Sequence, residues 1–114
     1  MTGTDGHRCS WRFSDGVVAE VASLGPQGMG LLKAVMKRYG SGVALPRQVK
    51  HLGGGLWELR TNQGNNHYRL IFFQPKPFIS VGLRAFYKNT EKISKSDMAL
   101  ATKRRKVWES RSKD

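Results

Sequence analysis

Cationic and proton-carrying side chains recur along the middle of the chain, on and before three segments with strand-like patterning. In chain order they are Lys50, His51, Glu58, Arg60, His67, Arg69, Arg84 and Lys88. Cleavage of RNA without a metal needs a base for the 2′-OH proton, cations that stabilise the dianionic phosphorane, and an acid for the leaving 5′ oxygen. Arg and Lys suit the second task, and His, Glu, Lys or Tyr suit the other two. These residue types therefore fit metal-free phosphodiester chemistry.

Each of these residues also has a plain structural interpretation. Arg60 and Arg69 could be solvated residues on the outer face of a sheet. Glu58 and Arg60, two residues apart on one strand face, could form a simple ion pair. A lone histidine such as His51 or His67 is usually a surface or capping residue. Residue type and spacing alone leave both interpretations open.

The charge balance is the strongest compositional signal. The 114 residues include 20 Lys+Arg against 8 Asp+Glu, which gives a formal net charge of +12. Such an excess favours a polyanionic partner, either nucleic acid or an acidic protein surface. The four successive cations at residues 103–106 are candidate phosphate contacts, although solvation alone would explain them. No apolar run reaches the ~18 residues of a spanning helix, so we expect no membrane partner.

The sequence gives little support to metal or disulfide chemistry. Cys9 is the only cysteine, so no internal disulfide can form, and the three histidines lack a paired metal-binding spacing. The glycines at 53–55 are not followed by Gly-Lys-Ser/Thr, so they indicate a turn into a strand and not a phosphate-binding loop. We expect no metal, no cofactor and a reduced, cytoplasmic setting.

The candidate residues need a scaffold, and glycine and proline divide the chain into short elements that could supply it. Apolar spacing predicts the order β-α-α-β-β-β-α, at residues 7–13, 17–24, 27–39, 56–61, 67–73, 78–87 and 96–110. Residues 41–55 are interpreted as mostly loop. The prediction is one α+β domain over residues 7–114, with helices on a small antiparallel sheet and a flexible tail at residues 1–6.

Three motifs in this order resemble phage-derived HigB-like toxins of the RelE/ParE superfamily. Residues 49–60 (VKHLGGGLWELR) resemble the signature of these toxins, and residues 67–73 (HYRLIFF) resemble their next strand. Residues 86–94 (FYKNTEKIS) resemble the family's Phe-x-Lys-Lys-Thr-x-Lys-x-Pro segment. The last helix resembles the Glu-x-x-x-Ala-x-x-Arg ending. The resemblance covers about residues 11–108.

The resemblance implies a RelE-like fold with an N-terminal helical hairpin and a C-terminal helix on a twisted antiparallel sheet. It implies the toxin of a type II toxin–antitoxin system, a metal-independent mRNA endoribonuclease. Such a toxin acts on ribosome-bound mRNA, leaves a 2′,3′-cyclic phosphate and inhibits translation. The implied partners are mRNA, the ribosome and a helix-turn-helix, HigA-like antitoxin, with operator DNA contacted only through the antitoxin complex.

The resemblance also assigns roles to the candidate residues. Arg69 matches the arginine that stabilises the transition state, and Arg60 falls where relatives carry a basic residue on the neighbouring strand. No equivalent of the C-terminal tyrosine of RelE lies near Lys95, so His51 or His67 is the hypothetical proton carrier. The predicted catalytic residues are Arg69, Arg60, Lys50, Lys88, His51 and His67. The predicted RNA-binding residues are Lys92, Arg84, Lys103, Arg104, Arg105 and Lys106.

Two other functions stay open on the sequence. ParE-like members share the fold but inhibit DNA gyrase, and in that case the basic face would bind protein or DNA and Arg69 would be structural. A non-catalytic RNA-binding module would use the +12 charge for salt-sensitive binding without turnover. The set Lys50, Arg60, Arg69 and Lys88 favours the nuclease.

Overall fold

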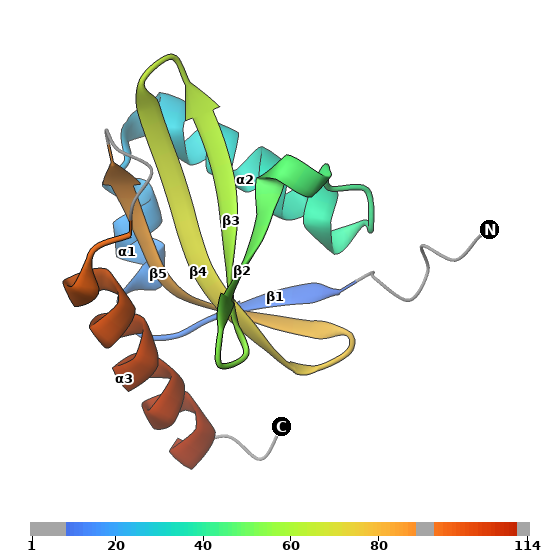
Figure 1. Ribbon diagram of the computed structural model, residues 1–114, viewed down its shortest axis with the longest axis vertical. Helices are drawn as coiled ribbons and strands as arrows, with labels where there is room; N and C mark the ends of the chain where they lie inside the picture. The colour runs from blue at the N-terminus through green and yellow to red at the C-terminus, as the bar shows by residue number, and fades with distance from the viewer. Residues whose placement is uncertain (1–8, 89–92, 112–114) are drawn as a thin grey trace.

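A computed structural model describes residues 9–88 and 93–111 of the chain (Figure 1). In chain order the elements are β1 (Ser10–Phe13), α1 (Val17–Ala22), α2 (Gly25–Gly40), the short 3₁₀ helix η2 (Pro46–Gln48), β2 (Val49–Gly53), β3 (Leu56–Gln63), β4 (Asn66–Lys76), β5 (Ile79–Lys88) and α3 (Lys95–Arg111). The predicted α+β class and element order are confirmed, with β2 as an addition. The predicted tail at residues 1–6 and the predicted RNA contact Lys92 lie outside the described residues.

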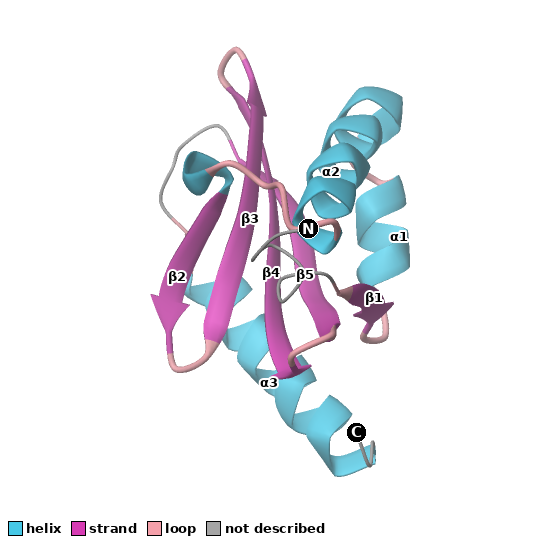
Figure 2. Ribbon diagram, turned by 90° about the vertical axis from the view of Figure 1, so that its right-hand side faces the viewer, coloured by secondary structure: helices cyan, strands magenta, loops and turns pink. Residues whose placement is uncertain are grey.

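The five strands form one sheet in the order β1-β5-β4-β3-β2. Strands β3, β4 and β5 form the predicted antiparallel meander, and β2 adds to it in antiparallel fashion. The first strand departs from the predicted antiparallel sheet, because β1 pairs with β5 in parallel. The sheet is therefore mixed. The α1–α2 hairpin carries the chain from β1 at one edge of the sheet to β2 at the other. Figure 2 shows α1 and α2 on one face of the sheet and α3 on the other.

Strand β2 occupies part of the segment that the sequence analysis interpreted as loop. It pairs with β3 through Val49↔Leu59, Lys50↔Glu58 and His51↔Trp57. None of its side chains is fully buried, so an edge strand of five residues leaves little apolar alternation to detect. The glycines at 53–55 have φ values of 98°, 63° and 83° and make the turn into β3, which confirms that part of the interpretation.

The period-two alternation of the strands divides the hydrophobic core into two clusters, one on each face of the sheet. Leu59, Leu70, Phe72 and Ala85 pack against the α1–α2 hairpin. On the other face, Ile71, Phe73, Val81 and Leu83 pack with Ala101 of α3. Helix α3 covers only part of its face, so the remaining part is available for polar side chains.

The contact between α2 and β4 supplies a matched pair of glycines for a stability test. A Cβ at Gly28 would clash with the ring of Tyr68, whereas a Cβ at Gly30 of the same helix would meet nothing within 4 Å. Gly28→Ala is therefore expected to lower the free energy of unfolding by about 1–3 kcal/mol through overpacking. Gly30→Ala is expected to raise it by about 0.5–1 kcal/mol, because alanine favours a helix interior. Urea unfolding followed by circular dichroism measures both, and similar effects of the two substitutions would contradict this packing.

Candidate active site on the sheet

The strand register gathers most of the predicted catalytic side chains on the α3 face of the sheet. Residues paired across neighbouring strands point to the same face, and residues two apart on one strand do the same. Three rows of such residues are Lys50–Glu58–Ile71–Arg84, Arg60–Arg69–Phe86 and Asn62–His67–Lys88. We call Lys50, Glu58, Arg60, Asn62, His67, Arg69 and Lys88 the basic face. Five of the six predicted catalytic residues belong to it.

His51 is the predicted catalytic residue that does not belong to the basic face. It pairs with Trp57, and the centroids of the two rings are 4.4 Å apart. Trp57 packs against the core cluster under α1 and α2, on the opposite side of the sheet. Since neighbouring residues of a strand point in opposite directions, Lys50 and His51 cannot serve one site on a single face. Of the two candidate histidines, only His67 lies with the arginines.

Arg69 is buried, with 1% of its surface exposed. Its Nη1 donates to Asn62 Oδ1 at 3.0 Å and to the backbone carbonyl oxygens of Tyr68 at 3.2 Å and Thr61 at 3.4 Å. A buried guanidinium needs such acceptors, because desolvation without them costs several kcal/mol. The Arg69 side chain therefore links the end of β3 to the start of β4 through hydrogen bonds to both backbones.

The carboxylate of Glu58 lies between two guanidinium groups. It is also 1% exposed, with Oε2 3.6 Å from Arg69 Nε and Oε1 3.4 Å from Arg60 Nε. The ion pair between Glu58 and Arg60 that their spacing suggested is therefore present. The Arg60 side chain is 22% exposed. Arg60 thus offers an accessible charge at a position that the buried Glu58–Arg69 pair fixes, whereas Arg69 itself is covered.

Arg69, His67 and Asn62 meet in a triangle of polar contacts. Arg69 Nη2 lies 3.0 Å from His67 Nδ1, and this same nitrogen lies 2.9 Å from Asn62 Oδ1. A guanidinium can only donate, so if Nδ1 accepts from Arg69 the imidazole proton is on Nε2. If Nδ1 instead carries the proton, His67 donates to Asn62. The position of the proton on His67 is thus coupled to both neighbours, and Asn62 was missed in the sequence because its asparagine-rich segment indicated only a turn.

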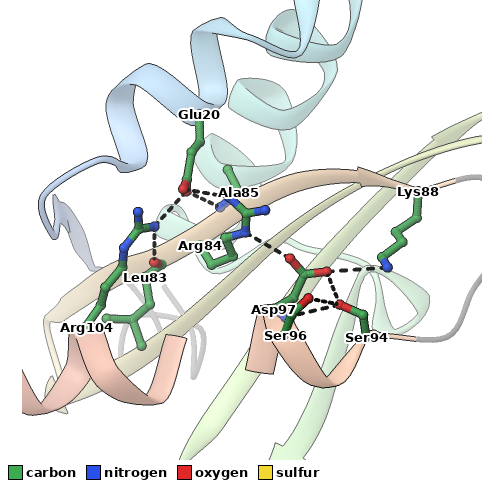
Figure 3. A network of polar contacts seen from close by, with 9 residues as sticks. All are labelled: Glu20, Leu83, Arg84, Ala85, Lys88, Ser94, Ser96, Asp97 and Arg104. Atoms are coloured by element: carbon green, nitrogen blue, oxygen red, sulfur yellow. Dashed lines mark hydrogen bonds and ion pairs between the residues drawn. The ribbon is translucent and has the colours of Figure 1, made fainter. Parts of the chain in front are cut away.

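Two of the predicted RNA-binding arginines, Arg84 and Arg104, are engaged in a network that fixes the helices (Figure 3). The carboxylate of Glu20 on α1 accepts from Arg84 Nη1 at 2.6 Å, from Arg104 Nη1 at 2.8 Å and from the backbone N–H of Ala85 at 3.1 Å. Arg104 also donates to the carbonyl oxygen of Leu83 at 2.9 Å. Strand β1 pairs with β5 only as far as Gly82. Beyond that residue, the Glu20 and Arg104 side chains form hydrogen bonds with the backbone groups of β5 that β1 does not reach.

Asp97 extends the same network to the start of α3. Its Oδ1 accepts from Arg84 Nε at 2.9 Å, and its Oδ2 accepts from Ser94 Oγ at 2.7 Å and lies 3.4 Å from Lys88 Nζ. Burial by itself would raise the pKa of both carboxyl groups. Hydrogen bonds from Arg104, Ala85 and Arg84 nevertheless bring the pKa of Glu20 below its ordinary 4.5, and hydrogen bonds from Ser94 and Arg84 bring that of Asp97 below 3.8. Lys88 is therefore the member of the basic face that is joined to α3.

The remaining cations of the run at residues 103–106 do not act alike. Arg105 Nη1 donates to the carbonyl oxygen of Gly54 at 2.7 Å, and its guanidinium lies 4.8 Å from the centroid of the Phe73 ring. Arg105 therefore ties α3 to the turn between β2 and β3. Lys103 and Lys106 are exposed and stay candidates for phosphate contacts.

A polar hollow of about 360 Å³ lies beside the basic face, next to η2. Its lining residues are Arg47, Gln48, Arg60, Thr61 and Asn62. The hollow adds an exposed cation, Arg47, to the surroundings of Arg60. No pattern in the sequence marked Arg47, because it lies in the segment interpreted as loop.

Residues 9–88 and 93–111 hold no group of three or more His, Cys, Asp or Glu side chains that could bind a metal ion. Within the same residues, no helix combines the length and the apolar character needed to cross a bilayer.

Comparison with known proteins identifies the family. The model of the family described as phage-derived protein Gp49-like (DUF891) matches residues 30–106, which is more than half of the chain. Probable endoribonuclease HigB1 of Mycobacterium tuberculosis strain CDC 1551 / Oshkosh is 36% identical over 89 residues, covering 78% of this chain and 70% of that relative. HigB1 of strain ATCC 25618 / H37Rv matches with the same identity and coverage. The chain belongs to the phage-derived Gp49-like family, and the resemblance to HigB-like toxins of the RelE/ParE type is confirmed.

The lowered pKa values of Glu20 and Asp97 predict how acid affects the fold. A carboxyl group with a lowered folded pKa stabilises the protein fully above its unfolded pKa, and this contribution is lost as the pH falls through the folded pKa. The free energy of unfolding of the wild type should therefore be higher than that of a Glu20→Gln/Asp97→Asn variant. This excess should be largest above about pH 5 and should shrink toward about pH 3.

Urea unfolding of both proteins at these two pH values measures the effect. Glu109→Gln is the control, because it removes a carboxylate that is 51% exposed and paired with Arg105 on its own helix, where ion pairs contribute little. An excess that stays constant between the two pH values would show that the network contributes no charge-dependent stability.

Proposed function

We propose that this protein is the toxin of a type II toxin–antitoxin system and acts as a metal-independent endoribonuclease on ribosome-bound mRNA, thereby inhibiting translation in the cytoplasm. The observation that carries the proposal is the convergence of Lys50, Arg60, His67, Arg69 and Lys88 on one sheet face. The relatives named probable endoribonuclease HigB1 support the same chemistry. The net charge of +12 favours a polyanionic substrate.

In the proposed reaction the 2′ oxygen of the RNA attacks the neighbouring phosphorus atom and the bond to the 5′ oxygen breaks. The products are a 2′,3′-cyclic phosphate and a free 5′-OH. Negative charge builds on the phosphoryl oxygens in the transition state, so fixed cations beside them lower the barrier. Arg60, Lys88 and Lys50 are the accessible cations of the basic face, with the side chains of Arg60 and Lys88 22% and 25% exposed.

Arg69 takes a different part in this proposal from the one its family match suggests. Its burial favours a supporting role, in which it balances the charge of Glu58 and so holds Arg60 in place. Loss of Arg69 would remove one of the two guanidinium groups beside Glu58, which destabilises the fold and lowers the positive charge next to the phosphate site. An inactive Arg69→Ala variant would therefore not by itself assign Arg69 a contact with RNA.

His67 is the proposed proton carrier. When Arg69 donates to Nδ1, the proton of the neutral ring is on Nε2 and can form a hydrogen bond to a phosphate oxygen. In the second arrangement the proton is on Nδ1 and is donated to Asn62, so Nε2 can accept the 2′-OH proton and then pass it to the leaving 5′ oxygen.

The spacing of the outer lysines suggests how RNA crosses the sheet. Lys50 on β2 and Lys88 on β5 are separated by three strand intervals, or roughly 14 Å at about 4.8 Å each, and by four residues along the strands, or roughly 13 Å at about 3.3 Å each. They would therefore contact different phosphates, with the strand passing over Arg60 between them. The exposed Lys103 and Lys106 could add contacts further along.

The proposed partners are mRNA and the ribosome, together with a helix-turn-helix, HigA-like antitoxin. In this proposal operator DNA is bound only through the toxin–antitoxin complex. The strongly basic surface suits both an RNA substrate and an acidic inhibitor, because each neutralises excess positive charge.

Arg60 provides the direct test of the proposed ribonuclease. Inducible expression in a bacterium should arrest growth and create new mRNA 5′ ends within minutes. Arg60→Ala should lower the cleavage rate by roughly 10²–10³-fold, the loss typical when one group that stabilises an oxyanion is removed. Arg38→Ala is the matched control, because Arg38 is an exposed arginine in the last turn of α2, on the other side of the sheet.

The result decides among the three functions. Growth arrest with intact mRNA and damaged DNA would replace the proposal by gyrase inhibition. RNA binding without new ends would leave a non-catalytic module. Equal activity of Arg60→Ala and Arg38→Ala would remove Arg60 from the site.

The two histidines form a natural pair for testing the proton carrier. His67→Ala should abolish most mRNA cleavage, whereas His51→Ala should leave it unchanged, because His51 lies on the opposite face against Trp57. Mapping of mRNA ends measures activity, and circular dichroism of the purified variants shows whether each remains folded. Full activity of a folded His67→Ala variant would exclude His67 as the proton carrier.

A further inference from the structure

A groove on the opposite edge of the molecule from the η2 hollow lies between β1, the β1–α1 connection and α3. It has a volume of about 540 Å³, within the range of roughly 300–1,000 Å³ typical of binding pockets. Arg12 and Ser14 contribute from the β1 side, and Leu100, Lys103, Val107 and Trp108 contribute from α3. The residues proposed for catalysis do not line it.

The floor of this β1–α3 groove is apolar. Leu100, Val107 and Trp108 are seven and eight residues apart on α3, so they lie on one stripe of the helix. Val107 is 37% exposed and Trp108 only partly buried against the core. An apolar floor of this kind favours side chains of another protein over the phosphates of RNA, because burying apolar surface is favourable and burying phosphate charge is not.

The rim of the groove is basic. Arg12 and Lys103 are exposed, and Arg104 and Arg111 also line the walls, although these two are paired with Glu20 and Asp15. Four cations thus face the single acidic residue Asp15. This balance is complementary to an acidic segment.

We propose that the β1–α3 groove is the docking site for an acidic segment of the antitoxin, with its apolar side chains on Leu100, Val107 and Trp108 and its carboxylates at Arg12 and Lys103. This inference rests on the proposed function for the identity of the partner. The chemistry of the occupant follows from the groove alone.

Nuclear magnetic resonance of the full ¹⁵N-labelled chain tests the occupant directly. The indole N–H signal of Trp108, assigned with Trp108→Phe, should shift when a synthetic amphipathic Leu/Glu peptide is added. A Leu/Lys peptide of the same pattern and an oligouridylate RNA should leave it in place. A shift with RNA but not with the acidic peptide would assign the groove to RNA and overturn the proposal, as would no shift with either.

Two matched pairs of variants locate the binding. Val107→Asp and Arg12→Glu should weaken the peptide at least tenfold. Val18→Asp, at a valine on α1 that is 66% exposed, and Lys33→Glu, at an exposed lysine on α2, should leave its affinity unchanged. Equal losses in the groove and control variants would show that binding reflects net charge alone and would overturn the proposal.

Co-expression with the proposed helix-turn-helix antitoxin separates this proposal from the proposed function. Val107→Asp toxin should still arrest growth but should escape neutralisation, whereas Val18→Asp toxin should be neutralised like the wild type. Neutralisation of Val107→Asp toxin would overturn the docking site. A wild type without toxicity would instead contradict the proposed function, and the peptide titration would still decide the occupant of the groove.

Discussion

Two members of the basic face, Glu58 and Arg69, carry charges of opposite sign and are buried side by side. Desolvating such a pair costs several kcal/mol for each ion, and only mutual attraction with additional hydrogen bonds offsets it. Here Arg69 has the carboxylate, one side-chain amide and two backbone carbonyls as acceptors. The positions of Arg60, Asn62 and His67 all depend on this pair, because each contacts one of its members.

A second set of carboxylates organises the helices around the sheet. Glu20 and Asp97 connect α1 and α3 to the edge of β5 through Arg84, Arg104 and Lys88. In a chain with only 8 acidic residues, Glu20, Glu58 and Asp97 are all placed between cations. The acidic residues therefore decide which cations are fixed in the fold and which remain available to a partner.

The sequence predicted the fold well because long apolar patterns identify elements reliably. The meander of β3, β4 and β5 and the three helices follow from periodicity. The short edge strand β2 was missed because none of its side chains is fully buried. The predicted cations Arg84, Arg104 and Arg105 could not be recognised as structural, since their partners Glu20, Asp97 and Gly54 are distant in sequence.

The candidate site was predicted in its residue types but not in its layout. Lys50 and His51 point to opposite faces of the sheet because side chains alternate along β2. The motif places the two residues next to each other, so this separation follows only once β2 is recognised as a strand. Burial likewise separates Arg60 from Arg69, although both occupy similar positions on neighbouring strands. Whether a cation faces solvent or a buried carboxylate depends on tertiary packing, and this packing could not be derived from the sequence pattern alone.

A double-mutant cycle on Glu58 and Arg69 tests the central claim that this buried pair supports the site as a unit. Urea unfolding of Glu58→Gln, Arg69→Met and the double variant gives the coupling energy. Each single substitution should cost about 3–5 kcal/mol, because it removes an oppositely charged partner from a buried charge, and the double variant should regain a large part of that loss. Strictly additive losses would mean that the two charges act independently and would contradict the account.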